Sequence, residues 1–357
     1  MMLIVWILVL VAAVWAAHWG ADGLATPLQK LRKQWGLSEA AGAAFVALAT
    51  ASPEVGTNTV SAVRGLSDIG LGNLLGSNII SVPAIVLVAY LASQTRTANR
   101  NQPPVEKQIR ENVGGSSTNL VQRETRLDVF GSWTALRVKP EALTAQAIPY
   151  LLVIALAALL TLPTPWRGLQ PIDGWIMLAA YAVYVSQAIL RQRQQGEPVR
   201  WRSSEIVIAG CGILALMIGA YFIVAATEQI VSILGISQMI GGVFITSTLS
   251  IAPEVFATWS VARSGQMTAA TTSVIADNTA TMTLAFFPLA LVGMTIEDGL
   301  LFSVNLAFVA LLGVAYAAVI QWGRQKHSFE LWEVGTLIGI YLVYLVVMLV
   351  WVLKVFS

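Results

Sequence analysis

Long apolar stretches recur along the whole chain, and their length constrains its fold more than any other feature. Stretches suited to a hydrocarbon core about 30 Å thick occur approximately at residues 3–17, 40–63, 70–92, 147–162, 172–190, 206–226, 238–262, 267–294, 299–320 and 331–356. Hydrophobic residues make up 56% of the chain and charged residues 11%, with a mean hydropathy of +0.71. This profile is far from that of a soluble domain. It predicts an all-α integral membrane protein with about ten transmembrane helices.

Basic residues indicate how these spans are oriented. If the spans alternate in direction, one side of the membrane receives all but three of the 21 Lys and Arg residues, the exceptions being Arg64, Arg167 and Lys354. The positive-inside rule then places both termini outside a prokaryotic plasma (inner) membrane. The first span lacks the basic start of a signal peptide, so we expect it to be retained. The net charge of +2 therefore reflects topology, and the expected partners are the bilayer and inorganic cations, with no nucleic acid.

The dipeptide Pro-Glu occurs twice inside apolar spans, at Pro53-Glu54 and Pro253-Glu254, with a separation of 200 residues. A carboxylate at bilayer depth is costly unless it faces a protein interior or water, which makes an intramembrane Glu a candidate functional residue. Two such residues in matching contexts indicate one site built by two halves of the chain.

The sequence around the two dipeptides also repeats. Identical pairs at the same offset are Gly42/Gly242, Pro53/Pro253, Glu54/Glu254, Val55/Val255, Ala62/Ala262, Gly65/Gly265 and Asn78/Asn278. With five spans in each half, the second half enters the bilayer inverted relative to the first. Two inverted five-helix repeats that meet near the midplane are the architecture of secondary transporters.

Oxygen-bearing side chains accompany both glutamates. Proline within a helix frees a backbone carbonyl, here near Ala49 and Leu249, and Thr50 and Ser250 lie beside them. The following spans add further candidates, namely Ser77, Asn78 and Ser81 in the first half and Asp277, Asn278 and Thr281 in the second. Carboxylates, hydroxyls and carbonyls are ligands for hard cations.

Nitrogen and sulfur ligands are scarce by comparison. No cluster of Cys and His favours zinc or copper, and we expect His18 and His327 to lie near span ends, at the membrane interface. We expect no bound cofactor.

Two segments resemble a known family. The stretches Ala49–Glu54 and Gly72–Asn78 resemble the first alpha-repeat of the cation/calcium exchanger superfamily, which includes the sodium/calcium exchangers, and the stretch from Leu249 to Asn278 resembles the second. The resemblance implies a ten-helix antiporter in which Glu54 and Glu254 bind Ca²⁺ and compete for it with the coupling ion. It also implies supporting roles for Thr50, Ser250, Ser77 and Asn78.

Several positions depart from the family pattern. Serines associated with sodium sites are replaced by Ala51 and Ile251, and Thr281 stands where sodium-coupled members often carry Asp. An acid appears one turn earlier, at Asp277. The expected activity is export of a divalent cation, Ca²⁺ by resemblance, in exchange for Na⁺. The alternatives are proton-coupled exchange of Ca²⁺, Mg²⁺ or Mn²⁺ without sodium sites, and a cation channel.

The apolar spans and the polar stretches between them divide the chain into five parts. Residues 1–92 and 147–190 form the first repeat around a polar cytoplasmic loop at 93–146, and a linker at 191–205 leads to the second repeat at 206–357.

An intramembrane hydrolase would need a nucleophile with a base, or ligands such as H-E-x-x-H, and the sequence contains neither pattern. We therefore expect a transporter rather than an enzyme.

Overall fold

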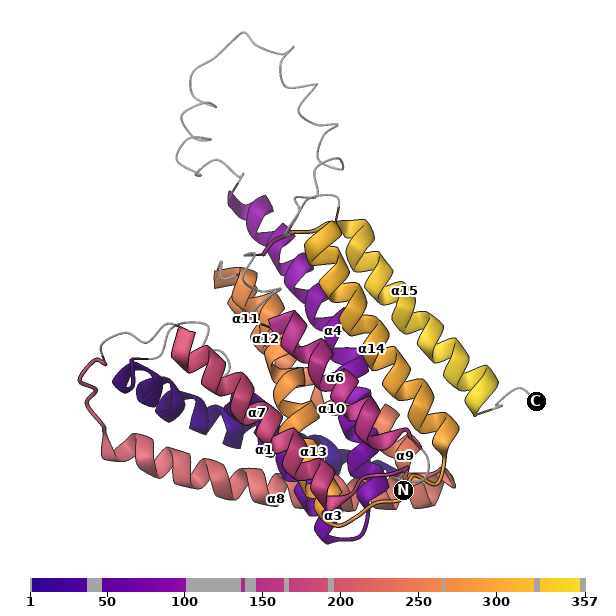
Figure 1. Ribbon diagram of the computed structural model, residues 1–357. Helices are drawn as coiled ribbons and strands as arrows, with labels where there is room; N and C mark the ends of the chain where they lie inside the picture. Colours follow the sequence, from indigo (N-terminus) through magenta and orange to yellow (C-terminus); the bar gives the residue numbers. More distant parts are fainter. Residues whose placement is uncertain are drawn as a thin grey trace, which may run out of the picture.

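The computed structural model of this chain is built mainly from long helices (Figure 1). It describes residues 2–36, 47–100, 136–138, 146–163, 167–191, 196–264, 267–323 and 328–353. The helices of the first half are α1 (Met2–Gln34), α3 (Ser52–Val63), α4 (Ser67–Arg100), α6 (Ile148–Thr161) and α7 (Pro171–Arg191). Those of the second half are α8 (Ser203–Leu234), α9 (Gln238–Ile240), α10 (Ser247–Ser250), α11 (Ala252–Ser264), α12 (Met267–Ala280), α13 (Phe286–Leu291), α14 (Gly299–Trp322) and α15 (Leu331–Val347). Three π-helical segments complete the spans: η3 (Gly241–Thr246), η4 (Thr281–Ala285) and η5 (Met348–Val352).

The predicted fold class is confirmed. Among the described residues, seven helical spans are long and apolar enough to cross a membrane, and α6 is a shorter apolar helix. With α7 and the span that contains α3, the layout is that of a ten-helix, multi-pass protein in two halves. In Figure 1, α4 lies alongside α14 and α15 while α1 and α8 lie together at one end of the bundle.

The pairing of α1 with α8 shows the inverted relation of the two halves. These helices run antiparallel: Lys30, near the end of α1, forms an ion pair with Glu205 at the start of α8. Further along, a Cβ atom on Gly20 would meet the carbonyl of Gly212, and one on Gly219 would lie 2.8 Å from the carbonyl of Ala13. Small residues thus let the two backbones touch.

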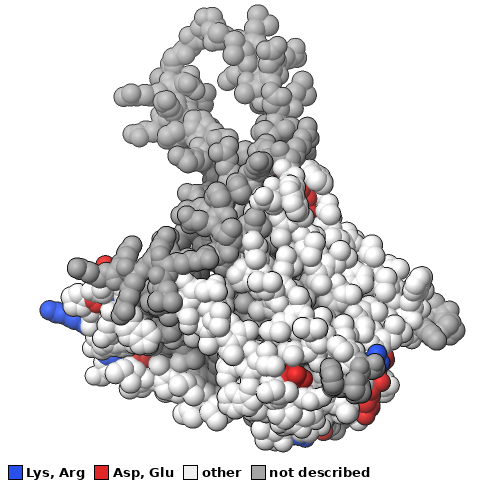
Figure 2. All heavy atoms as spheres, viewed as in Figure 1, with Lys and Arg blue, Asp and Glu red and all other residues white. Residues whose placement is uncertain are grey.

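The central helices differ from the peripheral ones in burial. The membrane-spanning parts of α4 and of residues 267–291 are 67% and 78% buried, whereas those of α8 and α15 are 22% buried. The space-filling view shows a largely uncharged outer face (Figure 2). Large exposed apolar side chains on this kind of surface include Ile206, Leu214, Met217, Leu311 and Val346. Such a surface suits lipid, and the polar residues are kept for the interior.

Some predicted boundaries were wrong. The first span was expected to end at Ala17, but α1 continues to Gln34, a helix of about 50 Å at 1.5 Å per residue. The polar loop was expected from residue 93, but α4 continues to Arg100. Most of that loop, residues 101–135 and 139–145, lies outside the described residues. At its end, β1 (Leu136–Arg137) pairs with β2 (Ser328–Phe329) in an antiparallel register.

Each Pro-Glu dipeptide begins a new helix. The helical path is interrupted by a single turn residue, Ala51 in the first half and Ile251 in the second, and α3 and α11 begin at the next residue. Pro53 and Pro253 therefore lie in a first helical turn, where proline costs no hydrogen bond. The prediction of prolines within helix interiors was wrong in this respect, and the break comes just before them.

The carbonyl predicted to be freed at the first break is used locally. The Ser52 hydroxyl donates a 2.6 Å hydrogen bond to the carbonyl of Ala49. In the second half, the N–H of Ile251 donates to the carbonyl of Ser247 at 3.2 Å, which continues the helical pattern through the break. The Ala49 oxygen is thus accounted for by a neighbouring residue, as buried backbone groups generally are.

Candidate cation site

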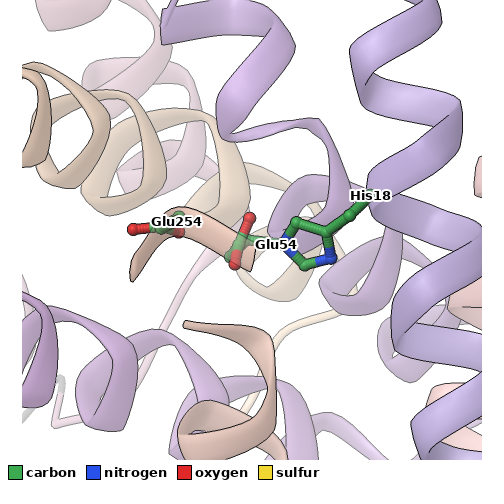
Figure 3. Close-up of side chains that lie close together, drawn as sticks. All are labelled: His18, Glu54 and Glu254. Carbon is green, nitrogen blue, oxygen red and sulfur yellow. The ribbon is translucent and has the colours of Figure 1, made fainter. Parts of the chain in front are cut away.

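The first turns of α3 and α11 carry the two glutamates into one place. Glu54 is 2% exposed and Glu254 is partly buried. A carboxylate in a first helical turn is stabilised by the positive end of the helix dipole. Because the two halves are inverted, these two helix starts approach each other from opposite parts of the sequence, and the predicted meeting of Glu54 and Glu254 is what the structure has (Figure 3).

A third side chain, His18 of α1, joins the glutamates. One ligand atom each from His18, Glu54 and Glu254 lies within 4.8 Å of the other two. In Figure 3 the imidazole points toward the Glu54 carboxylate, which lies between His18 and Glu254. The prediction that His18 lies at the interface was wrong, because α1 is twice as long as expected and residue 18 falls in its middle.

Two buried polar atoms of this cluster make no hydrogen bond. Glu54 Oε2 and His18 Nε2 are buried and have no hydrogen-bond partner. An unpaired buried polar atom costs about 1–3 kcal/mol. A proton or a cation placed between the three groups would remove that cost.

Asp277 of α12 is a third acid near the glutamates. It is 7% exposed, and its Oδ1 atom has no hydrogen-bond partner. Its carboxyl lies within hydrogen-bonding reach of the Thr50 side chain and close enough to both glutamates for their charges to interact. The site therefore holds more negative potential than two glutamates alone would give.

Four predicted site residues bind one another across the two halves. Asn78 Nδ2 donates to Thr281 Oγ1 at 3.1 Å, and Ser81 Oγ donates to Asn278 Oδ1 at 3.0 Å. The offset of 200 residues exchanges the members of these two pairs, which makes them reciprocal. Tyr150 of α6 links both amides, donating to Asn78 Oδ1 at 3.1 Å and accepting from Asn278 Nδ2 at 3.5 Å.

These hydrogen bonds connect α4 to α12 and η4 of the second half. The amide groups of this network are hydrogen-bonded within the protein and need no ion to satisfy them, so their role as ligands stays a prediction. Two other predicted site residues, Ser77 and Ser250, are also buried. Ser77 is 9% exposed and donates to the Leu74 carbonyl at 3.2 Å, and Ser250 is 3% exposed. The Ser250 carbonyl lies near the His18 ring.

Removing Asn278 from the network should destabilise the protein. The change Asn278→Ala leaves the Ser81 hydroxyl without its acceptor and removes one contact of Tyr150. Interhelical hydrogen bonds in membranes contribute about 0.6 kcal/mol each on average, so we expect a loss of about 1–2 kcal/mol. Thermal unfolding of the purified protein measures it. Ser303→Ala is the control, because Ser303 donates only within its own helix, to Gly299, and an equal loss there would contradict a special role for the network.

Two residues of this region, Tyr150 and His18, were not among the predicted site residues. Nothing in the pattern around Tyr150 distinguishes it from other aromatic residues of the spans. His18 carried a detectable signal, because it is one of only two histidines in the chain and directly follows the apolar run of residues 3–17.

Comparison with known proteins identifies the family of this chain. Residues 4–114 and 204–350, one segment in each half, match the family model of the sodium/calcium exchanger protein. The chain belongs to this family. Over 79 residues it is 35% identical to the sodium/calcium exchanger MaX1 of Methanosarcina acetivorans, a match that spans 22% of this chain and 23% of that relative.

Two solved exchangers have a similar fold. The H⁺/Ca²⁺ exchanger CAX superposes with a TM-score of 0.66 and 15% identity, over 97% of this chain and 80% of that one. The sodium-calcium exchanger NCX_Mj superposes with a TM-score of 0.59 and 16% identity, over 96% of this chain and 99% of that one. At these identities the likeness concerns the fold alone.

Proposed function

We propose that the protein is a secondary active antiporter that exchanges a divalent cation for protons, with Glu54 and Glu254 at the binding site. One observation carries this proposal: each inverted half contributes one carboxylate to the same point, with ligand atoms within 4.8 Å of each other. A site shared by two inverted halves is suited to alternating access, because rocking of one part against the other opens it to either side in turn.

The charges of the site suit a divalent substrate. Two ionised glutamates neutralise one divalent cation, and the same two carboxylates can instead take up two protons. Protonation and metal binding therefore exclude one another, which is the requirement for coupled exchange. Asp277 adds a third carboxyl nearby, so the site can stay partly charged after two protons have bound.

Proton coupling fits the surroundings of the site better than sodium coupling. A sodium site needs additional neutral oxygens, but Ala51 and Ile251 have no hydroxyl, and Thr281 is an acceptor for Asn78. Asn78 and Asn278 are likewise engaged with Tyr150. The two solved exchangers of similar fold are a proton-coupled and a sodium-coupled exchanger, so this fold accommodates either ion.

The coupling ion can be identified in liposomes. Purified protein is reconstituted with a pH-sensitive dye inside, and Ca²⁺ or Mn²⁺ is added outside, in one series with no sodium present and in a second series with sodium inside the liposomes. We expect divalent entry to expel protons and raise the internal pH. Sodium-dependent exchange with no change of internal pH would contradict proton coupling, and protein-free liposomes are the control.

A further inference from the structure

We propose that His18 is the third ligand of the cation site, and that its nitrogen makes the site select a first-row divalent transition ion, represented by Mn²⁺, over Ca²⁺. This inference rests on the proposed function only for the transport of the ion. The binding site itself is argued from the side chains of α1, α3 and α11.

The hydrogen bond of the imidazole leaves the correct nitrogen free. His18 Nδ1 lies 2.9 Å from the carbonyl of Val14, one turn earlier in α1. A carbonyl accepts but cannot donate, so Nδ1 carries the proton and Nε2 of the neutral ring has a lone pair. A histidine that ligates a metal is generally held in this way, with its other nitrogen bonded to a carbonyl or carboxylate.

The free nitrogen faces Glu54, whose carboxylate lies between His18 and Glu254 (Figure 3). Nε2 is buried without a hydrogen-bond partner, and so is Glu54 Oε2. A lone pair that faces carboxylate oxygens within 4.8 Å is repelled by them unless a positive charge lies between. The arrangement brings one nitrogen and two carboxylate groups within 4.8 Å of one another, and the Ser250 carbonyl near the ring is an additional oxygen.

This mixed donor set discriminates among divalent ions. Ca²⁺ and Mg²⁺ are bound by oxygen ligands. Imidazole favours transition metals, whereas carboxylates also suit Mn²⁺. One imidazole with two carboxylates therefore fits Mn²⁺ better than Ca²⁺.

His18 has no histidine counterpart at the matching position of the second repeat. The position that corresponds to it in the second half is Ile218, an apolar side chain that is 57% exposed. The two glutamates have each other as counterparts, but the nitrogen ligand comes from one half alone. A residue that breaks the symmetry at the centre of the site sets this site apart from a purely symmetric oxygen site.

The test uses the full-length protein, purified and loaded with Mn²⁺. Electron spin echo envelope modulation detects a nitrogen nucleus coordinated to Mn²⁺, and we expect this modulation in the unaltered protein. The chain has two histidines, so His327→Gln is the matched control and should keep the signal, whereas His18→Ala should lose it. His18→Gln, a substitution that keeps a polar side chain, replaces His18→Ala if the latter fails to fold.

Selectivity is measured on the same samples by competition of Ca²⁺ against bound Mn²⁺. We expect His18→Ala to lower the preference for Mn²⁺ over Ca²⁺ at least about tenfold, the lower end of the loss seen when groups that support a metal are removed. Absence of nitrogen modulation in the unaltered protein, or an unchanged preference in His18→Ala, would overturn the inference. In that case a proton lies between the groups instead.

The two proposals fail in different ways. Proton-coupled Ca²⁺ exchange that is unaffected by His18→Ala would leave the antiport proposal intact and remove His18 from the ligands. Nitrogen-coordinated Mn²⁺ in a protein that transports no divalent ion would do the reverse.

Discussion

Replacing either Glu54 or Glu254 by glutamine should abolish divalent cation exchange. Glutamine keeps the size of the side chain but removes the charge, so the site would hold one carboxylate too few to neutralise a divalent ion or to release two protons. Loss of a group that only supports a metal costs roughly 10–100-fold in affinity, and loss of a direct ligand should cost more. Initial rates of Ca²⁺ or Mn²⁺ uptake into proteoliposomes measure the effect.

The control for these changes is Glu197→Gln, because Glu197 is an exposed glutamate in the linker before α8. The Glu197→Gln variant should exchange ions at the same rate as the unaltered protein. If either Glu54→Gln or Glu254→Gln kept more than a small fraction of the exchange, that residue would have no place at the centre of the site.

Replacing Gly242 by leucine should prevent correct folding. A Cβ atom on Gly242 would lie 2.8 Å from the backbone nitrogen of Asn73 and 2.9 Å from Cα of Gly72, and it would meet the carbonyl of Ile69. These are backbone atoms of α4, which cannot move aside as a flexible side chain can. Overpacking usually costs about 1–3 kcal/mol of stability. Where η3 crosses α4, we expect a loss of about 3 kcal/mol or more.

The yield of monodisperse protein and its unfolding temperature measure this effect. Gly335→Leu is the matched control, because Gly335 is exposed on α15 and has no atom within 4 Å of its potential Cβ. It should fold normally. Equal behaviour of the two variants would show that η3 and α4 do not touch as described.

Much of the fold follows from sequence patterns that have a physical origin. Apolar length predicted the spans, and the repeated Pro-Glu predicted that Glu54 and Glu254 come together, because two inverted halves can share one centre. The Asn78/Asn278 identity likewise indicated a joint role. Its form, reciprocal hydrogen bonds to Thr281 and Ser81, depends on side-chain distances that no one-dimensional pattern contains.

Other features depend on packing between distant segments. The break before each dipeptide falls at Ala51 and Ile251, neither of which is a helix-breaking residue, so only the following prolines indicated it. The place of His18 depends on the length of α1 and on its close packing with α8 through Gly20 and Gly212. That contact brings α1 to the site, and its two partners are 192 residues apart in the sequence.

Uphill transport tests the central claim most directly. Proteoliposomes with equal concentrations of Mn²⁺ or Ca²⁺ inside and outside are given a pH gradient, acidic inside. The account predicts that the unaltered protein accumulates the divalent ion against its rising gradient while protons leave, and that Glu54→Gln and Glu254→Gln do not. A divalent concentration that stays equal on both sides while the ion still permeates would identify a passive pathway and contradict an antiporter.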